Sequence, residues 1–191
     1  MRDETDPNRR QSLAIIAAQA YRIRDMIGDV MLFARPPQPE LQDVALLEVA
    51  QSVTERLTDD LTAGQCRVEF ASGADIVIRA DAVQLAVVWS ELLRNAVTAL
   101  QPAGGTIEVR ITAKDQFAEW TITDQGRGFT DVGREHAFDP FYSGRQAGRG
   151  LGFGLCKVAR IVDLHGGTIE ITSSPGGPTT VIVRWPRAIQ Q

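Results

Sequence analysis

The chain has 191 residues and a net charge of -4, with 43% hydrophobic and 23% charged residues. This balance is that of a globular protein and excludes disordered or low-complexity scaffolds. The acidic charge disfavours a nucleic-acid binder that relies on bulk electrostatics. No apolar run approaches the roughly 18 residues of a membrane span, and the polar N-terminus lacks the features of a secretory signal. These features predict a cytoplasmic chain without a membrane segment.

The two cysteines, Cys66 and Cys156, lie far apart in the sequence. Neither has CxxC spacing or a companion histidine, so they indicate neither a zinc site nor a disulfide framework. We expect them to be buried free thiols.

The N-terminal region predicts one long helix. Asp6 followed by Pro7 is a strong helix start, because aspartate can cap free N–H groups and proline suits the first helical position. Apolar residues then alternate at spacings of three and four, which is typical of a helix in a bundle. They are Leu13, Ile16, Ala20, Ile23, Ile27, Val30 and Ala34. A core-packing helix is the alternative, and the proline-rich segment 35–39 predicts a linker.

Periodicity and turn residues predict the remaining elements. Helices are expected at 44–61, 82–100 and 153–164, and strands at 67–71, 76–79, 106–112, 118–124, 168–173 and 179–185. Gly64 should end the first of these helices, and Asp81 should cap the second. Segment 125–150 has no clear periodicity and six glycines, which predicts a long functional loop.

Glu91 and Asn95 share one face of the expected helix 82–100. The carboxamide oxygen of Asn95 suits a hard cation such as Mg²⁺, and Glu91 could order a bound water or accept a proton. An ordinary solvated pair is the alternative interpretation.

Asp124 ends an expected strand beside Gly126 and Gly128. Glycines let a ligand approach the backbone closely, and the carboxylate could accept a hydrogen bond from an exocyclic amine. A hairpin turn with a capping aspartate is the alternative.

Glycine occupies every second position from Gly148 to Gly154, directly before the expected helix 153–164. The free N–H groups and the positive dipole end of such a helix attract phosphate. The segment is neither a Walker loop nor a Rossmann fingerprint, because no Gly-Lys-Ser/Thr follows and no strand immediately precedes it.

Together these motifs resemble the catalytic ATP-binding domain of sensor histidine kinases, whose fold is shared with gyrase-type and mismatch-repair ATPases. The resemblance covers the N box at 91–96 (ELLRNA), the first glycine box at 124–128 (DQGRG), the F box at 138–142 (FDPFY), the second glycine box at 150–155 (GLGFGL) and a closing segment at 177–180 (GPTT). All five stand in the family's order.

The resemblance implies that Asn95 binds Mg²⁺, that Asp124 pairs with the adenine amino group, and that 129–150 forms a mobile lid over ATP. Glu91, Asn95 and Arg145 would then act in catalysis, and Arg145 and Arg149 would contact phosphate. The remaining ATP-binding residues that it implies are Ala99, Gly126, Gly128, Phe129, Gly150, Leu151, Gly152, Phe153, Gly154, Leu155 and Thr180.

The first helix resembles the second helix of the dimerisation and histidine-phosphotransfer hairpin of the same family. The first helix of that hairpin, which carries the acceptor histidine, has no counterpart here. Neither His136 nor His165 has the acceptor's sequence context, so we expect both to be structural or incidental. We therefore interpret the chain as a fragment of a longer kinase, and a natural pseudokinase is the alternative.

The expected fold is a two-layer α/β sandwich with a mixed sheet and helices on one face, preceded by one long bundle helix. Residues 1–39 would be the hairpin remnant and linker, and 40–191 the catalytic domain. The resemblance implies transfer of the ATP γ-phosphoryl to a histidine outside this chain, then to a response regulator, in a parent protein that dimerises through the N-terminal helix. A gyrase-type ATP hydrolase and a non-catalytic nucleotide-dependent interaction module remain the alternatives.

Overall fold

The computed structural model describes residues 6–71, 76–142 and 152–187. The chain divides into two compact units, Met1–Pro36 and Pro37–Gln191. None of the described helices combines the length and apolar character needed to cross a membrane.

The first unit contains one helix, α1 (Pro7–Ala34), in its described part. The carboxylate of Asp6 accepts a hydrogen bond of 2.9 Å from the N–H of Asn8, and Pro7 is the first helical residue. The predicted start is therefore confirmed. The helix ends at Ala34, and Arg35 is its C-cap, because the proline that follows Arg35 disfavours helical geometry there. The predicted apolar seam lies along this single uninterrupted helix.

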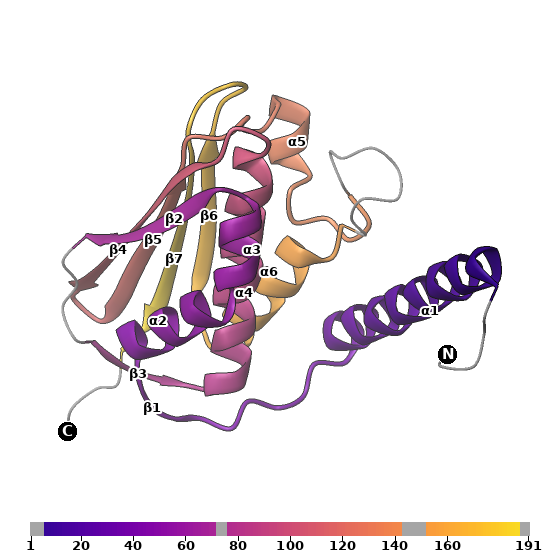
Figure 1. The fold of residues 1–191 in the computed structure, drawn as a ribbon. Coiled ribbons are helices and arrows are strands. Elements are labelled where there is room, and N and C mark those ends of the chain that lie inside the picture. Colours follow the sequence, from indigo (N-terminus) through magenta and orange to yellow (C-terminus); the bar gives the residue numbers. More distant parts are fainter. Residues whose placement is uncertain (1–5, 72–75, 143–151, 188–191) are drawn as a thin grey trace. The chain divides into compact units, whose positions relative to one another are not determined.

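The second unit is built on a five-stranded mixed sheet (Figure 1). Its strands, in spatial order, are β2 (Cys66–Ala71), β4 (Gly105–Lys114), β5 (Phe117–Asp124), β7 (Thr179–Pro186) and β6 (Thr168–Ser173). Only β2 and β4 are parallel; the other neighbours are antiparallel. The helices α2 (Leu46–Arg56), α4 (Ala82–Leu100) and α6 (Gly154–Leu164) cover one face of the sheet in Figure 1, which confirms the predicted fold class.

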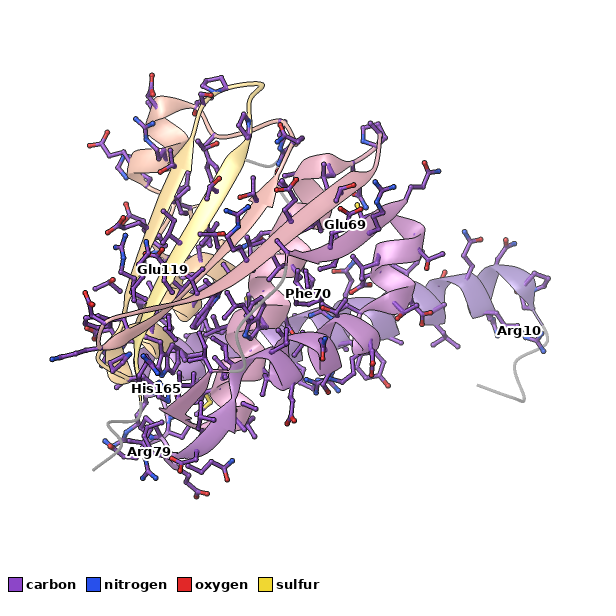
Figure 2. All side chains as sticks on the ribbon, turned by 90° about the vertical axis from the view of Figure 1, so that its left-hand side faces the viewer. Arg10, Glu69, Phe70, Arg79, Glu119 and His165 are labelled. Carbon is purple, nitrogen blue, oxygen red and sulfur yellow. The ribbon has the colours of Figure 1, made fainter. Side chains whose placement is uncertain are left out.

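The core between sheet and helices is centred on three fully buried tryptophans. Trp120 of β5 lies between Trp89 of α4 and Trp185 of β7, with ring centroids 5.4 Å and 5.8 Å apart. Because side chains alternate along a strand, the opposite face of the sheet is polar and carries Glu69 and Glu119 (Figure 2). The strand alternation thus separates the buried face from the solvent face.

The prediction of a single helix at 44–61 is wrong. This segment forms β1 (Gln42–Ala45), then α2, then a break at Leu57, then α3 (Thr58–Ala63). β1 pairs antiparallel with β3 (Val77–Ala80) in a separate two-stranded sheet that the sequence did not predict. Leu57 is buried, and its φ of -95° and ψ of 12° interrupt the helix so that the chain can turn around it. Gly64 ends α3 as predicted, although the left-handed conformation falls on Gln65.

The other predicted elements are confirmed. Asp81 caps α4 by accepting from the N–H groups of Val83 and Gln84, at 2.9 Å and 3.0 Å. The hairpin of β4 and β5, the helix α6, and the strands β6 and β7 lie where the periodicity placed them. The predicted loop contains one short helix, α5 (Asp131–Glu135), and residues 143–151 lie outside the described part of the chain.

His165, which is labelled in Figure 2, joins the end of α6 to the start of α4. Its Nδ1 donates to the carbonyl of Ile161 at 2.8 Å, and its Nε2 accepts from the N–H of Asp81 at 3.2 Å. Burial lowers the pKa of the ring, in keeping with this neutral tautomer. The contacts are those of a structural histidine. Cys156 is buried, as predicted, whereas Cys66 is partly exposed.

Candidate nucleotide-binding site

The start of α6 lies against the polar face of α4. A Cβ atom added to Gly154, the first residue of α6, would lie 2.8 Å from Oε2 of Glu91 and 3.8 Å from Nδ2 of Asn95. A side chain at position 154 would therefore displace the carboxylate of Glu91, and glycine permits this close approach. The structure thus brings the N box and the second glycine box together, although they are distant in the sequence.

Asn95 has an unusual carboxamide, because its Nδ2 is buried and has no hydrogen-bond partner among the described residues. A buried polar atom without a partner is costly, so such atoms often mark functional positions. An asparagine oxygen also suits Mg²⁺, which commonly takes one or two protein ligands and completes its shell with phosphate and water. The described residues contain no group of three or more metal-ligating side chains. Asn95 is therefore compatible with Mg²⁺ that a nucleotide helps to hold.

Glu91 pairs with Lys157 of α6, with 2.8 Å between Oε1 and Nζ. The lysine side chain is only 6% exposed and the glutamate 21%. The carboxylate is therefore engaged in an ion pair, a feature that the sequence prediction for Glu91 did not include. The available signal was the position of Lys157 on the otherwise apolar face of α6, between Cys156 and Val158.

Asp124 ends β5 with a carboxylate that is 4% exposed. Its Oδ1 accepts a 2.9 Å hydrogen bond from the N–H of Gly126, the one described residue that donates to this carboxylate. Burial raises the pKa of Asp124, and the bond from Gly126 opposes that shift. The arrangement fixes one oxygen and leaves the second able to accept from a ligand.

The loop after β5 lies against the last turn of α4. The N–H of Arg127 donates to the carbonyl of Ala99 at 3.1 Å, and a Cβ on Gly126 would lie 2.6 Å from the same carbonyl oxygen. These contacts bring Ala99 beside Asp124. Three predicted ATP-binding residues, Ala99, Asp124 and Gly126, are therefore neighbours.

Gly128 and Phe129 connect the same loop to the strands β6 and β7. Gly128 has a φ of +65°, and a Cβ there would lie 1.9 Å from the carbonyl oxygen of Ser174, so no other residue can take its place without a shift. The N–H of Phe129 donates to Oγ of Ser173 at 2.9 Å, and that hydroxyl bonds to Thr179 at 2.9 Å. These contacts with Ser173 and Ser174 fix the loop backbone at Gly128 and Phe129.

The structure does not bring Thr180 to this site. Thr179 is the register partner of Asp124, and both are buried on the helix-covered face. Because side chains alternate along a strand, Thr180 lies on the opposite face, where its hydroxyl bonds to that of Thr123 at 3.0 Å. Thr179, and not Thr180, therefore lies on the same face of the sheet as Asp124.

The approach to α6 is built from glycine and aromatic residues. Gly152 has a φ of +71°, and a Cβ there would lie 2.4 Å from the carbonyl oxygen of Tyr142. The ring of Phe153 meets that of Phe141 edge-on, with 4.7 Å between centroids. No side chain of the described residues caps α6, so its first N–H groups can bind an anion. Leu155, by contrast, packs against the hydrophobic core.

Four predicted site residues lie outside the described part of the chain: Arg145, Arg149, Gly150 and Leu151. Their assignment as phosphate contacts and lid residues therefore stays a prediction.

The fold and the site define a nucleotide-binding sandwich domain. It has a polar helix face, a buried carboxylate that can accept a hydrogen bond, and a glycine-rich helix start. Residues 80–189 match the family described as histidine kinase-, DNA gyrase B-, and HSP90-like ATPase, and the chain belongs to this family.

Sensor histidine kinases are among the curated relatives of this chain. Sensor histidine kinase ZraS of Klebsiella oxytoca is 31% identical over 177 residues, which cover 92% of this chain and 38% of ZraS. Signal transduction histidine-protein kinase AtoS of Escherichia coli K12 is 32% identical over 192 residues, which cover 96% of this chain and 30% of AtoS. The chain therefore spans less than two fifths of the length of either relative.

A solved structure, full-length ShkA in complex with AMPPNP, has the same fold. Its TM-score is 0.84 at 20% identity, and the match covers 98% of this chain and 40% of ShkA. Family and relatives together establish the chain as the ATP-binding catalytic part of a sensor histidine kinase, as the motif resemblance predicted. They do not favour a gyrase-type hydrolase.

Proposed function

We propose that this chain binds Mg²⁺-ATP and transfers its γ-phosphoryl group to a histidine on a helical hairpin outside the 191 residues. The observation that carries the proposal is the course of α4. Its last turn, at Ala99, lies beside Asp124, and one turn earlier Asn95 lies beside the start of α6. One helix therefore links a site for a base to a site for phosphates.

The adenine end is formed by Asp124 and the loop that follows it. A carboxylate that accepts from the exocyclic amino group selects adenine, because guanine has a carbonyl oxygen at the matching ring position. The buried surroundings strengthen this hydrogen bond. Gly126 and Gly128 keep the loop close to α4 and β6, and Thr179 adds a buried hydroxyl on the same face as Asp124.

The phosphate end is formed by the first turn of α6 and by Asn95. The N–H groups at Gly154, which no described side chain caps, and the helix dipole would stabilise the negative charge of the phosphates. Asn95 would hold Mg²⁺, which when bound neutralises phosphate charge. Arg145 and Arg149 would complete the site from the lid. Phosphoryl transfer needs mainly such positioning and charge stabilisation.

The division of the parent protein is part of the proposal. Residues 1–39 would belong to a dimerisation and phosphotransfer hairpin, and 40–191 to the catalytic domain. The separate unit that contains α1 supports this division. The parent protein would form a homodimer through this helix, act in the cytoplasm, and pass its phosphoryl group to the receiver domain of a response regulator.

Incubation with γ-labelled ATP tests this function. With a separately produced hairpin that carries an acceptor histidine, acid-labile label should appear in the hairpin, because the chain supplies ATP but no acceptor. His136 and His165 of the isolated chain should stay unlabelled, since both make structural contacts. Rapid ATP hydrolysis without transfer would favour a hydrolase, and binding without transfer or turnover would favour an interaction module.

A further inference from the structure

A buried ion pair joins α4 to α6 within the catalytic unit. Lys157 lies on the core-facing side of α6 together with Val158 and Ile161, and its ammonium reaches Glu91 of α4. A lysine that is 6% exposed is costly unless its charge is compensated. The pair is therefore a fixed feature of the interface between the two helices and not a mobile surface contact.

The carboxylate of this pair lies at the first turn of α6. Its Oε2 is 2.8 Å from the Cβ position of Gly154, next to Asn95. The proposed function places the phosphates of ATP at this helix start. An uncompensated carboxylate there would repel a polyphosphate, because charges of like sign interact strongly in partly buried surroundings.

We infer that Lys157 is a positioning residue of the nucleotide site. Its ammonium holds the carboxylate of Glu91 in place and neutralises it, so that a polyphosphate can approach the start of α6. The inference rests on the proposed function, because it requires phosphates at that helix start. Lys157 acts through Glu91 and needs no contact of its own with the nucleotide. A pair that only fastened α4 to α6 would not discriminate between ligands of different charge.

A double-mutant cycle with two ligands tests the inference. Mg²⁺-ATP and adenosine are titrated at one pH and salt concentration against the wild-type chain, Lys157→Met, Glu91→Gln and the double variant. Lys157→Met should weaken ATP binding about tenfold, because Glu91 is left uncompensated, and should leave adenosine binding nearly unchanged. Glu91→Gln and the double variant leave no uncompensated carboxylate, so both should bind ATP more tightly than Lys157→Met does. Lys157→Arg, which keeps the positive charge, should retain the wild-type affinity for ATP.

Two controls make the result decisive. Arg94 is also on α4, and Arg94→Met removes its exposed ion pair with Asp60 of α3. This variant should change neither the affinity for ATP nor that for adenosine. The double variant replaces a buried pair with neutral residues of similar size, a change that proteins usually tolerate, so it remains informative even if Lys157→Met unfolds.

If Lys157→Met loses affinity equally for ATP and adenosine, or if the double variant recovers no ATP affinity, the inference is overturned and the proposed function stays intact. A wild-type chain that binds no Mg²⁺-ATP would instead refute the proposed function itself.

Discussion

Replacement of Asp124 by alanine is expected to weaken ATP binding by roughly a hundredfold, because a hydrogen bond to a buried charged acceptor contributes about 1.5–3 kcal/mol. GTP binding should change far less, since guanine offers no amino group at that ring position. The preference for adenine over guanine nucleotides should therefore disappear. Competition titrations with ATP and GTP measure both affinities on one sample.

Two further variants separate recognition of the nucleotide base from the structure of the loop after β5. In Asp124→Asn the carboxamide oxygen can still accept from Gly126, so its Nδ2 would face the base and donate to the guanine oxygen. This variant should shift the preference toward GTP. Thr180→Val is the matched control, because its hydroxyl bonds to Thr123 on the other face of the sheet. Unchanged discrimination in both Asp124 variants would exclude Asp124 from base recognition.

Replacement of Asn95 by alanine should weaken Mg²⁺-ATP binding at least tenfold, because an oxygen ligand of the metal is lost. The effect should vanish when Mg²⁺ is removed by a chelator. The free energy of unfolding should change little, within about 1 kcal/mol, since Nδ2 makes no hydrogen bond within the described structure. Titration calorimetry measures the ATP affinity with and without Mg²⁺, and urea unfolding measures the free energy of unfolding.

Asn95→Asp provides the matched control, since it retains an oxygen ligand of similar size and should bind the metal. An Asn95→Ala chain whose affinity falls equally with and without Mg²⁺ would argue against the metal role. In that case the side chain would serve the nucleotide directly or through packing.

Much of the fold could be predicted because its signals are local. Asp6 and Asp81 start their helices through hydrogen bonds to neighbouring N–H groups, which a short segment of sequence determines. The two-stranded sheet could not be predicted in this way. The pairing of Gln42–Ala45 with Val77–Ala80 is nonlocal, and the turn around Leu57 depends on its burial in the core. A periodic apolar pattern at 44–61 therefore concealed a strand and a helix break.

The candidate site also has some features with local sequence signals and others that depend on nonlocal packing. Asp124, Asn95 and the glycine boxes stand out in sequence, because each motif is contiguous. The sequence pattern did not reveal the register of β7, in which Thr179, and not Thr180, shares its face with the buried Trp185. The Lys157 pair was missed because its two members come from separate helices, and only the packing of α4 against α6 brings them together.

We propose that a single nucleotide site runs along α4 from Asp124 to the start of α6. The most direct measurement is an NMR titration of the labelled chain with Mg²⁺ and a non-hydrolysable ATP analogue. The largest shifts should fall on the amides of Gly126, Gly128 and Gly154 and on the side-chain amide of Asn95. Without Mg²⁺, the shift of Asn95 should shrink and that of Gly126 should remain. Shifts confined to β1 and β3, or to the outer face around Thr180, would contradict this account.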